Sequence, residues 1–164
     1  MKIRRTLKCC MAWTLFLLLA ILPSCENKWP DNGAFDGMWQ LMEIDDGTSH
    51  SIKDQKLYWC VRTNLIQFTN AIQNVRMFAH FDKRGDRLLV YDLCYYSDNA
   101  NPNDDNEWIP FEKRDVLYNF GINAVEDKER EGRICQTFII KTLTSKALVL
   151  SDLNNTYTLT FRKF

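Results

Sequence analysis

The sequence predicts an all-β domain of antiparallel strands, folded as a barrel or a sandwich, that follows a short export signal. Three observations support this prediction. Short stretches rich in β-branched and aromatic residues are separated by polar turns, with little helical pattern between them. The last stretch, residues 156–164, alternates apolar and polar side chains with the period of two that a half-buried strand requires. The first 24 residues are basic and then apolar, as export signals are.

The export signal has a basic start and a short apolar core. Residues 1–8 carry four cations, and residues 11–22 form an apolar run of twelve residues. A helix that spans a bilayer needs about 20 residues, so this run has the length of a signal-peptide core instead. We therefore expect residues 1–24 to be cleaved from the chain.

The end of the signal carries a lipidation motif. Leu22-Pro23-Ser24-Cys25 resembles the lipobox of bacterial lipoproteins, with a small residue directly before the Cys. The resemblance implies that Cys25 becomes the first residue of the mature chain and carries diacylglyceryl and palmitate. The protein is then expected in the cell envelope, on the periplasmic or surface-exposed face of the outer membrane. The alternative is an ordinary secretory signal that happens to precede a Cys.

The signal hides the charge of the mature chain. The whole sequence has 21 basic and 21 acidic residues, but four of the basic residues lie in the signal, which leaves 17 against 21 and a net charge of −4. The mature part has no cluster of Lys and Arg. Binding to nucleic acid requires such a cluster to neutralise phosphates, so this class of partner is excluded.

Three cysteines follow Cys25 in the mature chain, namely Cys60, Cys94 and Cys135. An oxidising envelope permits one disulfide among them, which leaves the third thiol free. Buried free thiols that behave as small apolar side chains are the alternative. Their spacing matches no zinc motif, so the sequence predicts no structural metal and no cofactor.

The mature chain divides into a tether and one domain. Residues 25–36 comprise the lipidated Cys and a polar stretch with Pro30 and Gly33, which predicts a tether. Residues 37–164 hold the domain. The expected strands, in chain order, are residues 37–44, 57–68, 75–82, 87–95, 134–143, 146–151 and 156–164. The stretch at 57–68 is interpreted as one strand, bent if necessary.

Residues 83–86 form a hairpin signal between two of these strands. A two-residue turn at Gly85 places odd positions of the first strand on one face with even positions of the second. That face is expected to be the interior, and its members are Val75, Met77, Ala79, Phe81, Leu88, Val90, Asp92 and Cys94. The opposite face is partly apolar, through Phe78, Leu89 and Tyr91, and is available to pack under a loop or against a partner.

Two segments separate the hairpin from the last three strands. Residues 97–107 are rich in Asp and Asn, and we interpret them as an acidic loop. Residues 111–122 are expected to hold a short helix over 114–119, which Gly121 ends.

Both ends of the domain carry a family signature. Gly37-Met38-Trp39 opens the first strand, and Phe161-Arg162-Lys163-Phe164 closes the last. This resembles the lipocalin superfamily, and more closely the small lipocalin-like lipoproteins of Gram-negative bacteria, which also resemble this chain at residues 119–122. The resemblance implies an antiparallel up-and-down β-barrel of about eight strands. It also implies that Trp39 plugs one end, with Arg162 or Lys163 lying across the indole. An ordinary core Trp is the alternative for Trp39.

A barrel of this kind predicts a ligand pocket in its interior. Asp92 is the candidate polar group that would orient a ligand. The candidate apolar lining residues are Met77, Phe81, Val90, Tyr157 and Phe161.

The sequence carries no motif of a hydrolase, a zinc enzyme or a phosphate-binding loop, so no catalytic residues are predicted. His80 and Asp82 share a strand face, which is more typical of a surface His beside a solvated Asp than of a metal or acid–base pair. Likewise, the acidic loop does not match the spacing of a calcium loop.

The favoured function is therefore a membrane-anchored, non-catalytic barrel that binds a small hydrophobic or amphipathic ligand. The alternative is a structural or interaction module of the cell envelope that docks a protein partner and holds no ligand.

Overall fold

The computed structural model describes residues 31–95, 109, 111–128 and 133–164 of the chain. The export signal, Cys25, most of the tether and the acidic loop at 97–107 lie outside the described residues. Within the described part, no helix has the length and apolar character that crossing a bilayer demands.

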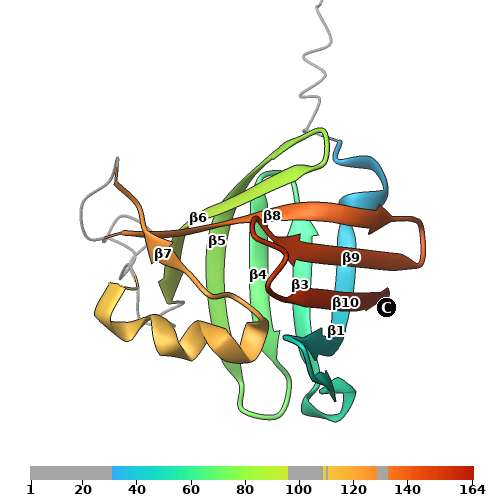
Figure 1. Cartoon of the computed structure of the whole chain (residues 1–164), viewed down its shortest axis with the longest axis horizontal. Coiled ribbons are helices and arrows are strands. Elements are labelled where there is room, and N and C mark those ends of the chain that lie inside the picture. Colours follow the sequence, from blue (N-terminus) through green and yellow to red (C-terminus); the bar gives the residue numbers. More distant parts are fainter. Residues whose placement is uncertain (1–30, 96–108, 110, 129–132) are drawn as a thin grey trace, which may run out of the picture.

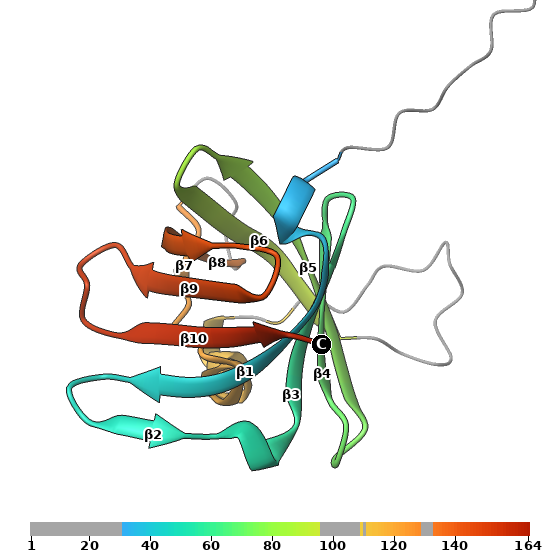
Figure 2. The same ribbon diagram turned by 90° about the vertical axis from the view of Figure 1, so that its right-hand side faces the viewer.

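The domain is a closed antiparallel β-barrel of eight strands (Figure 1). The barrel strands are β1 Gly37–Asp45, β3 Leu57–Arg62, β4 Leu65–Asn70, β5 Val75–Arg84, β6 Arg87–Tyr95, β8 Ile134–Leu143, β9 Ala147–Asp152 and β10 Thr158–Lys163. Each pairs with the next along the chain, and β10 pairs back onto β1, which closes the ring (Figure 2). The up-and-down barrel that the sequence resemblance implied is confirmed.

Five further elements lie outside the eight barrel strands. Two are strands that extend the sheet, β2 Ser49–Ser51 beside β1 and β7 Val125–Glu126 beside β8. Three are 3₁₀ helices, η1 Gly33–Phe35, η2 Lys53–Gln55 and η3 Phe111–Phe120. The expected helix over 114–119 lies inside η3, which ends where Gly121 adopts a positive φ of 76°.

The stretch at 57–68 differs from its prediction as one strand. It forms two strands, β3 and β4, which pair with each other in register from Leu57↔Asn70 to Arg62↔Leu65. The chain reverses at Thr63 and Asn64, where Thr63 takes a φ of 62°. The turn has no Gly or Pro, and its one residue that turns favour, Asn64, lies between two stretches with strand character, so the pattern was continued through it.

The hairpin of β5 and β6 follows the predicted register near its turn, where Arg84 pairs with Arg87. Further from the turn, a bulge shifts the pairing, so that His80 faces Tyr91 but Phe78 faces Cys94. Asp92 lies at the bulge with a φ of 52°, and Leu93 takes the buried inward position that the alternation assigned to Asp92. The predicted inward positions of Asp92 and Cys94 are therefore wrong, because the bulge inserts one residue into β6.

One hydrophobic core fills the barrel. At its centre Trp59 contacts the rings of Phe68, Phe138 and Phe161, all in edge-to-face arrangements with centroid distances of 5.0–5.7 Å. These four side chains come from β3, β4, β8 and β10, so the cluster joins opposite walls of the barrel. The core consists of apolar side chains, so a functional site is to be sought at the two ends of the barrel, which differ from each other.

Candidate functional site

The first end of the barrel is a closed floor built around Trp39. The indole Nε1 of Trp39 donates a hydrogen bond to the carbonyl oxygen of Phe35 at 2.7 Å, and both side chains are fully buried. The ammonium of Lys163 lies 4.9 Å from the centre of the Trp39 ring, which is a cation–π distance. Helix η1 and Lys163 thus cover the plug that the sequence resemblance placed at Trp39.

Gly37 makes room for this arrangement. A Cβ at Gly37 would lie 2.6 Å from Cε of Lys163, and the residue has a φ of 125°, which L side chains rarely adopt. With that space free, Nζ of Lys163 donates to the carbonyl oxygens of Asp36 at 2.6 Å and Ala34 at 3.0 Å. The Gly-x-Trp pattern therefore has a physical cause, because the absence of a side chain at Gly37 leaves room for Lys163 to lie over the Trp39 ring.

Arg162 does not take part in the floor, although it was the first candidate for the cation. It is exposed, and its guanidinium donates to Oε1 of Gln40 at 3.2 Å on the outer side of the barrel. Lys163 is the residue that pairs with Trp39 across β1 and β10, so it shares the face of the indole. Adjacent strand residues point to opposite faces, and this alternation separates the two cations.

The predicted lining residues of the interior belong to the core. Met77, Val90 and Phe161 are at most 1% exposed and Phe81 is 5% exposed, and all four lie in the same hydrophobic cluster. Phe81, for example, contacts the ring of Phe35 at the floor with a centroid distance of 5.3 Å. In the described structure these side chains fill the barrel rather than line a hollow.

Asp92 also lies away from the interior. Its carboxylate accepts a hydrogen bond from Nη1 of Arg133 at 3.0 Å, and the side chain is 11% exposed. The ion pair joins the bulge of β6 to the residue that precedes β8.

The second end of the barrel is closed by η3 and the residues after it. Leu117, Phe120 and Ile122 are buried in the core, and the carbonyl oxygen of Phe120 accepts a hydrogen bond from Nε1 of Trp59 at 3.2 Å. Gly121 packs so closely on Leu159 that a Cβ there would lie 2.5 Å from a Leu159 methyl carbon. Sequence reasoning found the helix but missed this role, for which the apolar residues around Gly121 were the available signal.

Two neighbouring indoles therefore donate hydrogen bonds to the segments that close the two ends of the barrel. Trp39 and Trp59 are directly paired on β1 and β3. One donates to the backbone of η1 at the floor, and the other donates to the backbone of η3 at the opposite end. One pair of adjacent residues thus makes hydrogen bonds to the segments that close both ends.

A pocket of about 540 Å³ remains beside the η3 plug, at the mouth of the barrel. It lies between the hairpin of β1 and β2, the end of η3 and the turn before β10. Its lining residues are Ile44, Asp46, His50, Ile52, Tyr118, Gly121, Ile122, Asn123, Thr156 and Tyr157. Apolar side chains with a few polar groups, at this volume, are typical of a site for a small ligand.

Tyr157 contributes an unusual polar group to this mouth pocket. Its hydroxyl is buried and has no acceptor for its proton among the described residues. Burial raises the pKa of Tyr157 to about 12, with the charge of Asp152 adding to the shift and the backbone of Asn123 opposing it. The hydroxyl therefore keeps its proton at neutral pH. Tyr157 is the one predicted lining residue that the structure brings to the mouth pocket.

Asp152 holds Tyr157 in place through the turn between β9 and β10. Its Oδ1 accepts hydrogen bonds from the backbone of Thr156 at 2.6 Å and of Tyr157 at 3.1 Å. Its Oδ2 accepts from the Thr156 hydroxyl at 2.8 Å and the Asn154 backbone at 3.2 Å. Burial alone would raise the pKa of Asp152, but these hydrogen bonds outweigh it and lower the pKa below its usual value.

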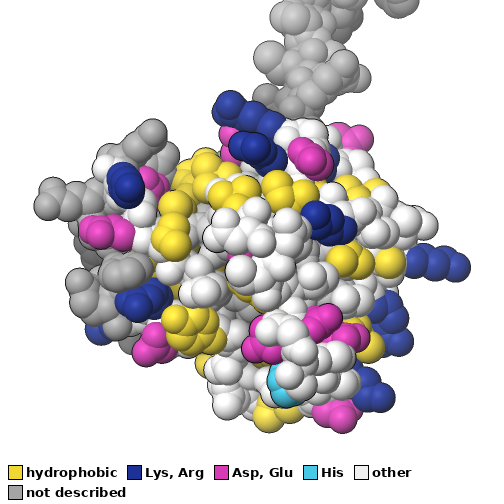
Figure 3. Space-filling model, in the orientation of Figure 1, with side chains coloured by type: hydrophobic (Ala, Val, Ile, Leu, Met, Phe, Trp, Pro, Cys, Tyr) yellow, Lys and Arg dark blue, Asp and Glu magenta, His cyan; other side chains and the backbone are white. Residues whose placement is uncertain are grey.

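The charged groups that line the mouth pocket are few. Asp46 and His50 are both exposed, with 4.0 Å between Oδ1 of Asp46 and Nε2 of His50. Figure 3 shows a histidine together with acidic side chains over the part of this face where the β1–β2 hairpin lies. Among the residues that the structure describes, no Lys or Arg lines the pocket.

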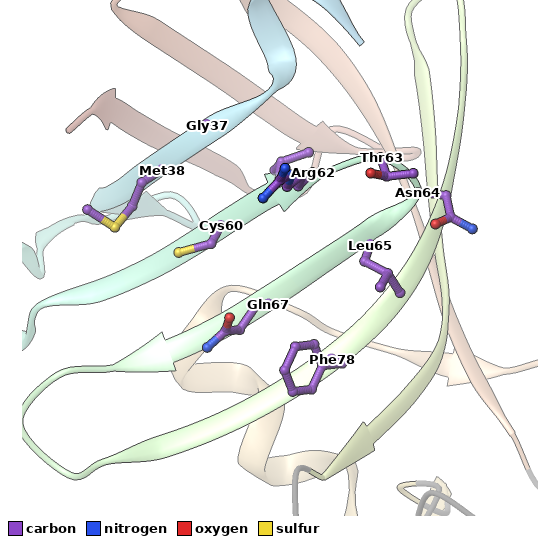
Figure 4. A pocket seen from close by; sticks show the side chains of 10 residues that line it. Gly37, Met38, Cys60, Arg62, Thr63, Asn64, Leu65, Gln67 and Phe78 are labelled. Carbon is purple, nitrogen blue, oxygen red and sulfur yellow. The ribbon is translucent and has the colours of Figure 1, made fainter. Parts of the chain in front are cut away.

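A second hollow of about 450 Å³ lies on the outer wall of the barrel (Figure 4). It runs over β1, β3, β4 and β5, and Met38, Cys60, Gln67 and Phe78 follow one another along paired positions of these strands. Cys60 is a free thiol, and burial raises its pKa, so it is no activated nucleophile. Another hollow of about 590 Å³ includes Leu89 and Tyr91, two of the predicted outward apolar residues.

The other predicted surface groups form ordinary local contacts. His80 stacks on Tyr91 with a centroid distance of 5.8 Å, and Asp82 pairs with Arg84 at 2.7 Å. The described residues contain no group of three His, Cys, Asp or Glu side chains that could hold a metal ion.

Comparisons with known proteins agree with the fold. The model of the lipocalin-like domain family matches residues 17–164. A lipocalin-like protein from Bacteroides uniformis has a similar crystal structure, with a TM-score of 0.52 and 20% identity over 80% of this chain and 100% of that one. An uncharacterized protein from Bacteroides eggerthii aligns with a TM-score of 0.47 and 16% identity over 79% of this chain and 98% of that one. No curated protein matches the sequence.

Proposed function

Because the chain belongs to the lipocalin-like domain family, we propose that it is a non-catalytic carrier of a small hydrophobic or amphipathic molecule, which it binds at the mouth of its barrel. The observation that carries this proposal is the pocket of about 540 Å³ at the mouth of the barrel, which is bordered by the partly buried side chains of Ile44, Ile52 and Tyr157.

The mouth supports binding better than the interior does. The candidate residues Met77, Phe81, Val90 and Phe161 are packed in the core, whereas Ile44, Ile52 and Tyr157 are only partly buried and border the open pocket. A ligand there would cover their exposed surface, and each Å² of apolar surface removed from water contributes about 25 cal/mol. The proposed site is thus moved from the barrel interior to its rim.

The chemistry of the mouth pocket favours binding over catalysis. Besides Tyr157, the lining residues with a hydroxyl are Tyr118 and Thr156, and the Thr156 hydroxyl donates to Asp152 rather than to a base that could activate it. The pair of Asp46 and His50 is exposed to solvent, where the dielectric weakens acid–base assistance.

A fluorescence titration with N-phenyl-1-naphthylamine, an uncharged apolar probe, tests the mouth site on residues 26–164. We expect saturable binding that Tyr118→Glu weakens about tenfold, since the substitution places a charge beside the apolar site. Leu65→Glu is the matched control, because Leu65 is 39% exposed on the outer wall and Tyr118 is 45% exposed at the mouth. Loss of binding in Leu65→Glu alone would move the site to the outer wall. Absence of binding in the unsubstituted chain would favour the protein-docking module instead.

We also propose that Cys25 is lipidated and that the mature chain is anchored to the outer membrane through residues 25–36. The support is the sequence of the signal, with its basic start, its apolar run of twelve residues and its lipobox-like end.

Metabolic labelling with an alkyne analogue of palmitate tests the anchor in the producing cell. The unsubstituted protein is expected to carry the label and to sediment with membranes, and Cys25→Ser is expected to lose the label. Cys60→Ser serves as the control, because Cys60 lies on a barrel strand. A label that persists in Cys25→Ser would disprove the anchor while leaving the mouth site untouched.

A further inference from the structure

We propose that the floor end of the barrel docks on a membrane surface, where its cations bind the anionic headgroups of phospholipids. This basic end comprises residues 31–37 and 62–65, the turns at 82–87 and 143–147, and residues 162–164. The inference goes beyond the carrier function and does not depend on it. Its test uses a chain without lipid on Cys25, so it can fail separately from the proposed anchor.

The first argument is that the fold gathers cations that lie apart in the sequence. The chain reverses at the floor between β3 and β4, between β5 and β6 and between β8 and β9, and β10 ends there beside β1. The basic end holds seven basic residues, namely Arg62, Lys83, Arg84, Arg87, Lys146, Arg162 and Lys163. It holds four acidic residues, namely Asp31, Asp36, Asp82 and Asp86. Seven against four leaves this end positive, although the mature chain as a whole is negative.

The second argument is that most of these cations face solvent. Those classed as exposed are Arg62, Arg84, Arg87, Lys146 and Arg162. Asp82 pairs with Arg84 at 2.7 Å, so these two residues add no net charge. Figure 3 shows Lys and Arg side chains at the top of the view, over the β5–β6 turn, and at the right, beside the β8–β9 turn and the end of β10. Arg62, Arg87 and Lys146 thus present positive charge from three separate turns.

The third argument is the distance from the basic end to the acidic groups of the mouth. Outside the basic end, the mature sequence has ten basic and seventeen acidic residues. Strand β1 runs from the floor towards the mouth over nine residues, which is about 30 Å. The Debye length at 0.1 M salt is about 10 Å, so charges at the mouth, such as that of Asp46, are screened from a surface that contacts the floor. A membrane at the floor therefore meets the local positive charge rather than the net negative charge of the chain.

The fourth argument is that the tether and an exposed apolar side chain lie at the same end. Nδ2 of Asn32 donates to the carbonyl oxygen of Thr63 at 2.7 Å, so the described chain enters the domain at the β3–β4 turn. Leu65 in this hairpin is directly paired with Arg62, and its side chain is 39% exposed. Apolar side chains next to cations are typical of surfaces that bind at the membrane interface. The segment proposed to carry the lipid thus reaches the barrel where the cations are.

Sedimentation with lipid vesicles tests the inference on residues 26–164 at pH 7.5. We expect the chain to bind vesicles made of equal parts of phosphatidylcholine and phosphatidylglycerol, because the second lipid is anionic. Vesicles of phosphatidylcholine alone should bind it at least about tenfold more weakly. Added salt should weaken the binding to anionic vesicles, since it screens the attraction between exposed charges.

Two triple variants locate the surface. The first removes one cation from each floor turn, through Arg62→Gln, Arg87→Gln and Lys146→Gln. Each substitution is expected to weaken the binding to anionic vesicles about fivefold, and the three together about 100-fold. The matched control removes the same charge from exposed positions outside the basic end, through Lys53→Gln, Arg76→Gln and Lys113→Gln. It should bind within about twofold of the unsubstituted chain.

Three results would overturn the inference. They are an unsubstituted chain that does not bind anionic vesicles, a basic-end variant that binds them undiminished, and equal losses in the two triple variants. The last result would mean that the net charge of the chain controls binding, wherever its cations lie. Thermal unfolding of both variants verifies that the barrel is intact. The palmitate label on Cys25 and the titration with N-phenyl-1-naphthylamine remain separate measurements of the anchor and of the carrier function.

Discussion

Single side chains fix the geometry of both barrel ends, and Asp152 is the clearest case at the mouth. Its carboxylate accepts four hydrogen bonds from three consecutive or near-consecutive residues and is 6% exposed. Among the described residues, the backbone of this turn pairs with itself only through Asp152 and through Asn155, whose N–H groups donate to the carbonyl oxygens of Tyr157 and Asp152, and the carboxylate accepts from the N–H groups of Asn154, Thr156 and Tyr157. The carboxylate therefore orders the segment that delivers Tyr157 to the pocket.

Replacing Asp152 with Asn is expected to lower the free energy of unfolding by about 1–3 kcal/mol, because charge-assisted hydrogen bonds are lost. The folded-state pKa of Asp152 is lowered, so its contribution to stability is present above the unfolded-state pKa of about 3.9 and is lost as the pH falls through the folded-state value. The difference between the two chains should thus shrink below pH 4. Urea unfolding at pH 7 and at pH 3 measures it, with the exposed Asp54→Asn as control.

For some single residues, the sequence pattern could not predict on which face of the barrel the side chain lies. The Gly-x-Trp pattern identified Trp39 as the plug, yet Arg162 and Lys163 are adjacent cations that only the strand register can tell apart. Likewise, Asp92 was assigned inward by counting from the turn, and the bulge in β6, opposite Ala79, moved it out. Faces follow from periodicity only as far as the ladder remains regular.

Among the elements, η3 closes one end of the barrel. Leu117 and Phe120 of the helix, and Ile122 directly after it, are buried in the core. The sequence predicted the helix because Gly121 provides a stop. Its position across the mouth could not be predicted, since no local pattern encodes which distant strands a helix will cover.

Gly121→Ala tests how firmly η3 is seated. The new methyl group would meet Leu159 at 2.5 Å and impose a φ of 76° on an L residue. We expect a backbone cost of about 1–2 kcal/mol and a further cost of about 1–3 kcal/mol from overpacking. Gly85→Ala is the matched control, because Gly85 has a φ of 61° but open space around it, and it should show the backbone cost alone. Denaturant unfolding measures the loss of stability in each variant. Equal losses in the two variants would show that η3 can move away from Leu159 without a loss of stability.

For the whole molecule, the pairing of β1 with β10 is decisive. It joins the two ends of the domain, from Trp39↔Lys163 to Asp45↔Thr158. Of the expected strands, those at 87–95 and 134–143 have the predicted bounds, because each is long and flanked by polar residues. Closure itself was implied by the family resemblance, since alternation alone fits a barrel or a sandwich equally well.

Deletion of residues 158–164 is expected to abolish folding. The deletion removes Leu159 and Phe161 from the core and exposes the edges of β1 and β9 at once. Far-ultraviolet circular dichroism of the shortened chain should show loss of the β signal, and a synthetic peptide of residues 157–164 should restore part of it. A shortened chain that stays folded and soluble would mean that seven strands form a stable open sheet.

The position of η1 has a consequence for the direction in which the protein works. The described chain begins at Asp31 on the floor side, while the pocket of Tyr157 lies at the far end of the barrel. Fully extended, residues 25–31 would span about 20 Å. This length is too short for the barrel to rotate easily until its opposite end faces the membrane. A lipid on Cys25 would therefore point the pocket away from the supporting leaflet. Such a protein would receive its cargo from the aqueous space or an opposing surface, not from the bilayer that holds it.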